Sequence, residues 1–192
     1  MVFHPEPSEM YAPDFCTWVD MDVLSKTLCG KSRPIHFRGV CTVVSKLFNI
    51  VTPDRAYFGQ KDAQQLAIIR RMVRDLNMDI EIVGCPIVRE EDGLAKSSRN
   101  TYLSSEERKA ALILSKTVAL GKELAKTEKD ANKVVEAMKK NIETEPLAKI
   151  DYVEAVDALS MAPVEKLEGT CMLAMAVYIG KTRLIDNTLI NE

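Results

Sequence analysis

The chain has 192 residues, with 26 lysines and arginines against 28 aspartates and glutamates, so its formal net charge is -2 and its pI is about 5.8. This balance offers no basic surface for DNA or RNA, and no apolar run approaches the roughly 20 residues that cross a bilayer. The chain has only two histidines and five dispersed cysteines without a C-x-x-C pair, which argues against a metal cluster or a disulfide framework. Its first residues do not have the pattern of a secretory signal. Together these features predict a cytoplasmic protein.

The first 90 residues alternate short apolar runs with segments of helical periodicity. The elements expected here are a loop over 1–15, a strand over 17–21, a short helix from Asp22 to Leu28, a basic loop over 30–39, a helix from about residue 40 that Pro53 stops, a strand over 55–58, a helix over 61–76 and a strand over 80–84. Strand, helix and strand at this spacing make a βαβ unit, which predicts a parallel sheet.

The pattern changes at about residue 91. Ser104 and Glu107 have the spacing of a capping box, with Ser104 before the first helical residue. The expected elements are one helix from this cap to about 126, a second helix over 131–143 capped by Asp130, strands over 149–156 and 171–179, a turn over 180–182 and a final segment over 183–187. The second half is therefore predicted to be a small α+β domain, and the whole chain belongs to the α/β class.

A polar stretch, Phe58 to Gln65, lies between the strand 55–58 and the helix that follows. Projection at about 100° per residue puts Asp62 and Gln65 on the apolar stripe of that helix. The free backbone N–H groups and the dipole at a helix N-terminus favour the binding of an anion. Gly59 allows the backbone to approach such a ligand closely, and Lys61 adds a positive charge. The stretch predicts a phosphate or carboxylate site. The alternative is that Asp62 only caps the helix and Lys61 is solvated.

Two further stretches carry cations. Residues 92–100 combine a glycine, two serines, Lys96 and Arg99, which suits a mobile loop over a polyphosphate but also an interdomain linker. Residues 33–39 carry Arg33 and Arg38, which could bind an anion or pair with surface acids, and His36 more often has a structural role at such a position.

Five blocks in this order, over 33–40, 58–65, 83–89, 92–100 and 183–187, resemble the signature blocks of the pantoate–β-alanine ligase (pantothenate synthetase) family. The resemblance spans nearly the whole chain. It implies a partial Rossmann-like parallel sheet of the nucleotidylyltransferase type over 1–90, followed by the small α+β domain over 91–192. It also implies an ATP-dependent ligase that joins pantoate and β-alanine through a pantoyl adenylate and releases AMP and pyrophosphate. Mg²⁺ would arrive bound to ATP, the protein would be a homodimer, and neither nucleic acid nor membrane would be a partner.

The resemblance also implies roles for single residues. The residues that would contact ATP are Gly59, Gln60, Lys61, Asp62, Val88, Lys96, Ser97, Ser98 and Arg99. Those that would be catalytic are Lys61, Ser97, Ser98 and Arg99. Gln65 would hold pantoate, Arg33 would line the site, and no residue is expected to bind a metal directly. Residues 96–99 are similar to the K-M-S-K-S loop of class I aminoacyl-tRNA synthetases.

The sequence departs from the family in one important respect. The family carries a His-x-Gly-His motif in its N-terminal portion, whereas the only histidines here are His4 and His36. The chain is therefore expected to be a truncated ligase of weak or absent activity. Smaller departures are Gln60 for Glu, Ile35 for Gly and Cys29 for Glu. The alternatives are a non-catalytic C-terminal folding or assembly module, and a related nucleotidyltransferase that adenylylates another small acid.

Overall fold

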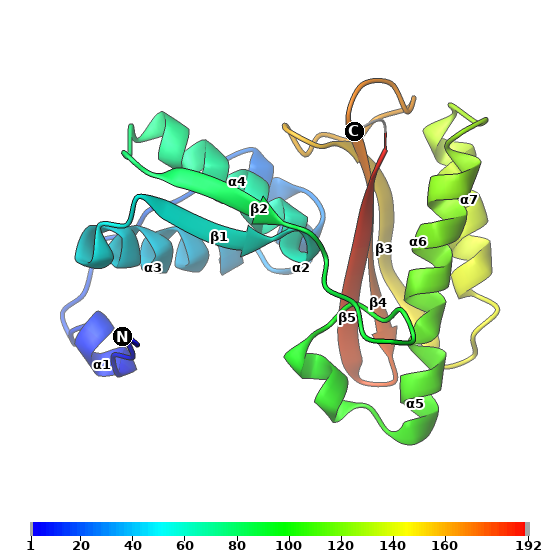
Figure 1. The fold of residues 1–192 in the computed structure, drawn as a ribbon, viewed down its shortest axis with the longest axis horizontal. Coiled ribbons are helices and arrows are strands. Elements are labelled where there is room, and N and C mark those ends of the chain that lie inside the picture. Colours follow the sequence, from blue (N-terminus) through cyan, green and yellow to red (C-terminus); the bar gives the residue numbers. More distant parts are fainter. Residues whose placement is uncertain (1, 191–192) are drawn as a thin grey trace.

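The structure, a computed structural model, describes residues 2–190 and contains a two-stranded and a three-stranded sheet (Figure 1). The helices are α1 (Pro7–Met10), α2 (Cys29–Ser32), α3 (His36–Val51), α4 (Ala63–Asp75), α5 (Ser105–Ala110), α6 (Leu112–Leu124) and α7 (Ala131–Ile142). The 3₁₀ turns are η1 (Leu24–Lys26), η2 (Gln60–Asp62) and η3 (Ser98–Tyr102). The strands are β1 (Arg55–Gly59), β2 (Glu81–Cys85), β3 (Ala148–Asp157), β4 (Cys171–Ile179) and β5 (Thr182–Ile190). Within this range, no helix is long and apolar enough to cross a membrane.

The first half is built on β1 and β2, which are parallel neighbours, so the predicted βαβ unit is confirmed. Their register runs from Arg55 opposite Glu81 to Gly59 opposite Cys85. Helix α4 connects the two strands and buries its apolar side, including Leu66. Because both strands run the same way, their carboxyl ends meet beside the start of α4. In parallel α/β sheets this is the edge where ligands bind.

The second half is the antiparallel sheet β3-β4-β5, with α6 and α7 on one of its faces (Figure 1). The central strand β4 is buried along nearly its whole length, because both of its faces are covered. Alternate residues such as Leu173 and Met175 belong to the hydrophobic cluster that contains Leu114 and Met138 of the helices. A side-chain period of two sends the residues between them to the other face. The apolar run over 171–179 is thus explained by its central position.

The other face of this sheet packs against the first half of the chain. Met172 and Ala174 of β4 share one hydrophobic cluster with Phe37 of α3 and with Ile68 and Ile69 of α4. Burying such side chains stabilises a fold by about 1.5–3 kcal/mol each. The two halves are therefore held together by an apolar core, and the predicted division of the chain between residues 90 and 91 stays a prediction.

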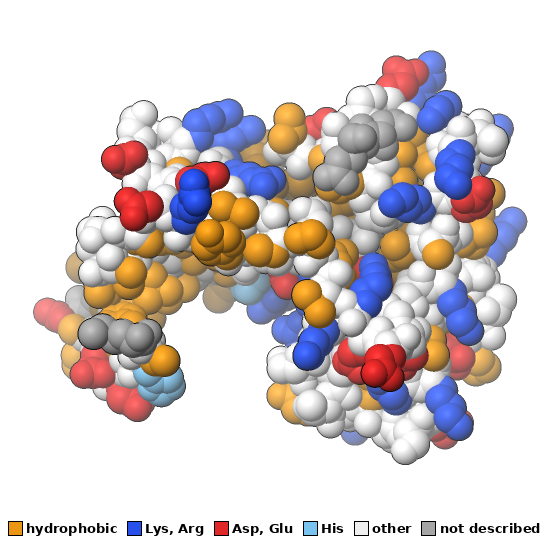
Figure 2. All heavy atoms as spheres, in the orientation of Figure 1, with side chains coloured by type: hydrophobic (Ala, Val, Ile, Leu, Met, Phe, Trp, Pro, Cys, Tyr) orange, Lys and Arg blue, Asp and Glu red, His pale blue; other side chains and the backbone are white. Residues whose placement is uncertain are grey.

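The face of the molecule drawn in Figure 2 differs between the two halves of the chain. Figure 2 shows hydrophobic side chains gathered over β1 and toward α1, while charged side chains are spread over the half that carries α6 and α7. Tyr57 of β1 is 63% exposed. Strand β1 pairs with β2 on one edge and, among residues 2–190, with no strand on the other.

Several predictions about the first 50 residues are wrong. Residues 17–21 form no strand, because the backbone N–H of Val19 donates to Thr42 Oγ1 (3.0 Å) and not to a neighbouring strand. Asp22 caps no α-helix and instead forms an ion pair with Lys26 around η1. The segments expected to be loops contain α1, α2 and the first turn of α3. These helical segments are too short for a helical period to be recognised in their sequence.

The single helix expected from Ser104 to about 126 is two helices, α5 and α6, which meet at Ala111. The N–H of Leu114 donates to the carbonyl of Ala111 at 3.1 Å, an i→i+3 bond that tightens the chain there. Asp130 does cap α7, since its carboxylate accepts the N–H groups of Asn132 and Lys133. The β3 and β4 strands are also confirmed, and the segment 183–187 lies inside β5.

The predicted capping box of α5 is present. Ser104 Oγ accepts the N–H of Glu107 (3.2 Å), and Glu107 Oε2 accepts the N–H of Ser104 (2.8 Å). Replacing Ser104 with alanine removes one of these bonds and is expected to lower the free energy of unfolding by about 1 kcal/mol. Urea denaturation measures this loss. Ser105→Ala, at the next and equally exposed position, is the control and is expected to have little effect.

Candidate functional site

A cleft of about 230 Å³ lies between the carboxyl end of β1 and the three-stranded sheet. Five of the predicted site residues line it together: Arg33, Lys61, Asp62, Gln65 and Arg99. They come from the end of α2, from η2 and α4, and from η3 in the segment after β2. The fold thus brings three stretches that are distant in sequence to one place.

Lys61 and Asp62 belong to η2, the 3₁₀ turn between β1 and α4. The Lys61 side chain is only 16% exposed, and its Nζ lies 3.4 Å from Asp62 Oδ2. Asp62 occupies the N-cap position of α4, but its carboxylate accepts no capping hydrogen bond. The interpretation of Asp62 as a simple helix cap with a solvated Lys61 is therefore wrong, and both side chains line the cleft.

The next turn adds an inward-facing residue that the helical projection did not indicate. This residue is Gln64, which is 5% exposed. Its amide donates to the carbonyls of Leu24 and Thr27 (both 2.8 Å) and accepts the N–H of Cys29 (3.0 Å). Gln64 thus fixes the chain before α3, whereas Gln65 is half-buried and lines the cleft.

The loop over 92–100 is anchored at its far end. Asn100 Nδ2 donates to Glu90 Oε1 (2.6 Å) and to the carbonyl of Ala95 (3.2 Å), and Ser97 Oγ accepts the N–H of Arg99 (3.2 Å). Ser97 lines a narrow hollow that also touches Lys61 and Arg99. A segment held in this way differs from a flexible linker, whose backbone makes no fixed contacts.

The remaining predicted residues lie outside the lining of the cleft. Lys96 and Ser98 are exposed, and Val88 is 65% exposed. Gln60 lines a separate shallow hollow beside Cys85. Gly59 is exposed at the end of β1, where a Cβ atom would meet no neighbouring atom within 4 Å. The structure therefore gathers five of the predicted residues in the cleft, with Ser97 adjoining it.

His36 also lines the cleft, at the first residue of α3. Burial lowers the pKa of this imidazole below its ordinary value, and the positive charge of Arg33 lowers it further, against the raising effect of Asp62. The side chain therefore favours its neutral form near neutral pH. A neutral imidazole adds no charge to the cleft.

The lowered pKa of His36 predicts a pH-dependent stability. Below the ordinary value of 6.5 the unfolded chain takes up a proton that the folded chain resists, so the free energy of unfolding should fall as the pH drops through this window. His36→Gln is expected to reduce that slope. Thermal melts from about pH 7.5 to about pH 5 measure it, with His4→Gln as the control at an exposed position. Equal slopes in the wild type and in both variants would contradict the prediction.

Three residues of the cleft carry no role in the sequence interpretation: Cys29, Tyr152 and Arg183. Tyr152 Oη lies 3.3 Å from Cys29 Sγ, and Arg183 Nη2 lies 3.6 Å from the same sulfur. Arg183 also donates to Asp151 Oδ2 at 2.8 Å. Burial raises the pKa of Tyr152, so its phenol stays protonated. Tyr152 lies on β3 and Arg183 on β5. Because they meet only through the pairing of the strands, no local sequence pattern indicates that they belong to the same site.

The charges in the cleft favour an anionic ligand. Arg33, Lys61, Arg99 and Arg183 all line it, and the carboxylates are those of Asp62 and Asp186. Asp186 is already paired with Arg89, and Arg183 with Asp151, and both of these partners lie outside the cleft lining. Arg33, Lys61 and Arg99 therefore face one carboxylate, that of Asp62. An excess of cations in a partly enclosed site attracts phosphate and carboxylate groups.

Comparison with known proteins identifies the kind of protein that this chain is similar to. A family model described as pantoate-beta-alanine ligase matches residues 1–189. Pantothenate synthetase of Ruminiclostridium cellulolyticum is 63% identical over 188 residues, which cover 97% of this chain and 67% of the relative. The pantothenate synthetase of Enterococcus faecalis is 64% identical over 187 residues, covering 97% and 66%. The chain thus spans about two thirds of the length of these relatives.

Solved structures agree with the sequence relatives. The crystal structure of pantothenate synthetase from Thermus thermophilus superposes with a TM-score of 0.92 at 42% identity, over 96% of this chain and 67% of that one. A pantoate-beta-alanine ligase from Francisella tularensis, crystallised with β-γ ATP and β-alanine, superposes with a TM-score of 0.70 at 29% identity, over 95% and 61%.

Proposed function

This chain belongs to the pantoate-beta-alanine ligase family, and we propose that its cleft binds ATP and pantoate for the ATP-dependent ligation of pantoate and β-alanine. The observation that carries this proposal is the meeting of Lys61, Asp62, Gln65 and Arg99 in one cationic cleft. The similar ligase of Francisella tularensis, crystallised with β-γ ATP and β-alanine, supports the choice of ligands.

The reaction has two steps. A carboxylate oxygen of pantoate attacks the α-phosphorus of ATP, and pyrophosphate leaves, which gives a pantoyl adenylate. The amine nitrogen of β-alanine then attacks the acyl carbon, loses a proton, and AMP leaves. The first step brings negative groups together, so cations that neutralise the developing charge lower its barrier. The second step gains most from holding amine and acyl carbon close.

The proposed roles follow from position and charge. Lys61 and Arg99 bind the phosphates of ATP, and Ser97 adds a hydroxyl beside them in the adjoining hollow. Asp62 accepts hydrogen bonds from the ribose, and Gln65 holds pantoate. We keep Gly59, Gln60, Val88, Lys96 and Ser98 as proposed ATP contacts, and Arg33 as a residue that lines the site. Lys96, Ser98 and Val88 are exposed, so they reach ATP only if their segments close over it.

Mg²⁺ fits this site as a companion of ATP. Among residues 2–190, no group of three or more histidine, cysteine or acidic side chains could hold a metal ion. Oxygen atoms of phosphates are the usual magnesium ligands in such sites. We propose that Mg²⁺ binds through the phosphates and shields charge that Lys61 and Arg99 do not reach.

Calorimetry with the 192-residue chain tests the proposal. Titration with Mg²⁺ and ATP, with and without pantoate, is expected to give heat of binding, and pyrophosphate release measures the first chemical step. Binding of ATP without release of pyrophosphate would indicate that the chain acts as a nucleotide-binding portion of the ligase without its catalytic activity. The absence of any binding would favour the alternative function, a module for folding or assembly. Adenylation of another small acid in place of pantoate would favour a related nucleotidyltransferase.

We also propose that the protein acts in the cytoplasm as a homodimer. The apolar surface over β1, where Tyr57 is exposed, offers area for association. Sedimentation equilibrium at several protein concentrations measures the oligomeric state. A monomer at every concentration would contradict the homodimer.

A further inference from the structure

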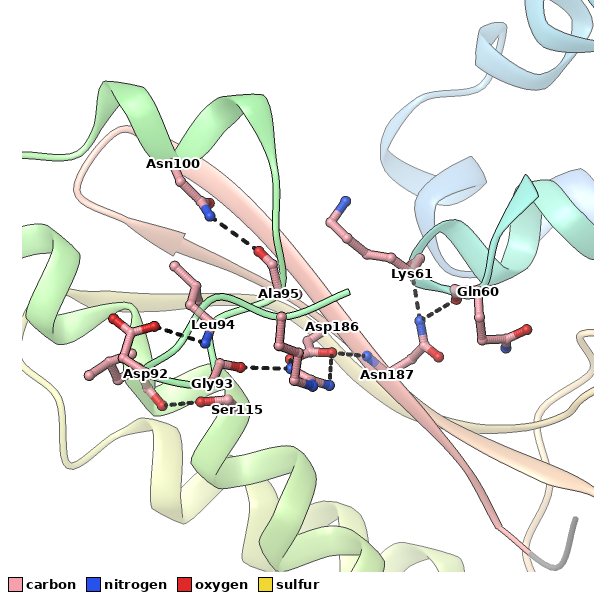
Figure 3. Close-up of polar contacts among 12 residues, drawn as sticks. Gln60, Lys61, Asp92, Gly93, Leu94, Ala95, Asn100, Ser115, Asp186 and Asn187 are labelled. Atoms are coloured by element: carbon pink, nitrogen blue, oxygen red, sulfur yellow. Dashed lines mark hydrogen bonds and ion pairs between the residues drawn. The ribbon is translucent and has the colours of Figure 1, made fainter. Parts of the chain in front are cut away.

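Two adjacent polar residues of β5, Asp186 and Asn187, are buried where this strand lines the cleft. They are 2% and 4% exposed. Figure 3 shows them between the turn that carries Lys61 and the loop that begins at Asp92. Buried polar groups are costly unless they are hydrogen-bonded, so their partners indicate what they stabilise.

Asn187 is bonded to the turn before α4. Its Nδ2 donates to the carbonyl of Gln60 (3.0 Å) and to the carbonyl of Lys61 (2.9 Å). An oxygen in place of this nitrogen would face two carbonyl oxygens, so the orientation of the amide is fixed. Both of its donor hydrogens thus hold the backbone of η2, whereas Oδ1 has no partner among the described residues.

Asp186 is bonded to the segment that leads into the loop over 92–100. Its carboxylate accepts from Arg89 Nη1 (2.7 Å) and Nη2 (2.9 Å), and Arg89 Nη1 also donates to the carbonyl of Gly93 (3.1 Å). The N–H of Asn187 donates to Asp186 Oδ1 at 2.8 Å, which links the two residues. A continuous network therefore runs from Lys61 through β5 to Gly93.

We propose that Asp186 and Asn187 are positioning residues that hold Lys61 and the loop over 92–100 on one rigid strand. The inference rests on the proposed function, because it assigns both segments to ATP. Both residues line the cleft, but their side chains bind backbone carbonyls and a guanidinium. They therefore act on the nucleotide through Lys61 and through the loop that carries Arg99. With both segments fixed to neighbouring residues of β5, the cations keep their spacing before ATP arrives, and the protein loses less conformational freedom when ATP binds.

Replacement of Asn187 by leucine tests the first arm of this network. The variant keeps the branched shape of the side chain, with methyl groups in place of the amide nitrogen and oxygen, and removes both donors to η2. Amide hydrogen exchange of the full chain without ligand is expected to rise at least about tenfold over residues 60–65, because two hydrogen bonds that restrain the turn are lost. Exchange in α6 and α7 is expected to stay unchanged. Unchanged exchange over 60–65 would overturn the proposal, whether or not the chain binds ATP.

A cycle of variants shows whether Asn187 acts through Lys61. In a chain that binds ATP, Asn187→Leu is expected to raise the dissociation constant of ATP about tenfold, and to add little once Lys61→Met is present. Independent, additive effects of the two changes would overturn the positioning role. Failure of the wild type to bind ATP would count against the proposed function alone, since the exchange measurement decides the positioning.

Asn141→Ala is the matched control. Asn141 Nδ2 donates to the buried hydroxyl of Thr117 at 2.7 Å, between α7 and α6 and outside the lining of the cleft. Loss of this hydrogen bond is expected to destabilise the second half of the chain but to leave η2 in place. The dissociation constant of ATP is expected to stay within about twofold of the wild type. A loss of affinity equal to that of Asn187→Leu would show that general destabilisation explains the effect, and would overturn the proposal.

Discussion

Replacement of Lys61 by methionine is expected to raise the dissociation constant of ATP by at least about tenfold, because a hydrogen bond from a charged donor contributes about 1.5–3 kcal/mol. The Lys61 side chain is 16% exposed and lies beside Asp62, so methionine can take its place along the same path. The loss should be electrostatic. Isothermal titration calorimetry at two salt concentrations measures it, and added salt should weaken binding by the wild type more than by the variant.

Lys116→Met is the matched control for this experiment. Lys116 is exposed on α6 and lies outside the cleft lining, and its replacement changes the net charge by the same amount. It is expected to leave the affinity for ATP unchanged within error. Equal losses in the two variants would mean that overall charge, and not the cleft, governs binding, and this result would contradict the role of Lys61.

The βαβ unit was predictable because its signals are local. Residues 55–59 are a short run closed by a glycine, and α4 carries an apolar stripe of helical period. The place of the cleft at the carboxyl end of β1 follows from the same pattern, since polar residues there precede the helix. Residues 17–21 show the limit of such signals, because Thr42, distant in sequence, takes the N–H group that a strand would offer to its neighbour.

The burial of Gln64 could not be predicted from the same pattern. Gln65, Leu66 and Ile69 all lie inside α4, so the helical projection that groups them holds, and Gln65 lines the cleft. Gln64 is buried because the chain before α3 packs over it, and its amide bonds to the carbonyls of Leu24 and Thr27. That segment is distant in sequence, so no local period indicates the contact.

The residues that the three-stranded sheet contributes to the site could not be predicted from the sequence, for another reason. Tyr152, Arg183 and Asn187 reach the site from β3 and β5, and their neighbours in sequence are ordinary strand residues. Only the packing of the sheet against α4 brings them near Lys61. Asp186 and Asn187 were part of a block that resembles the family, but their partners, Arg89 and the carbonyls of η2, become visible only in three dimensions.

Removing the cation from the ion pair between Arg89 and Asp186 should lower stability more than breaking any other salt bridge described here. The Asp186 side chain is 1% exposed and that of Arg89 is 31% exposed. The hydrogen bond to Asp186 raises the pKa of Arg89, which therefore stays charged. Arg89→Met leaves a buried carboxylate without its cation, and such changes cost about 3–5 kcal/mol. Because Arg89 is partly exposed and water can approach, we expect the lower end, about 3 kcal/mol.

Urea denaturation of three variants distinguishes a stranded charge from lost packing. Arg89→Met alone should unfold at clearly lower urea. The double variant Arg89→Met with Asp186→Asn removes the stranded charge, keeps an oxygen that can accept the N–H of Asn187, and should regain much of the loss. The control is Arg55→Met, since Arg55 pairs with Glu81 on the surface, where the side chains are 62% and 59% exposed. It should cost less than about 1 kcal/mol. A double variant no more stable than Arg89→Met would contradict the electrostatic account, because it would show that the loss does not come from the stranded charge of Asp186.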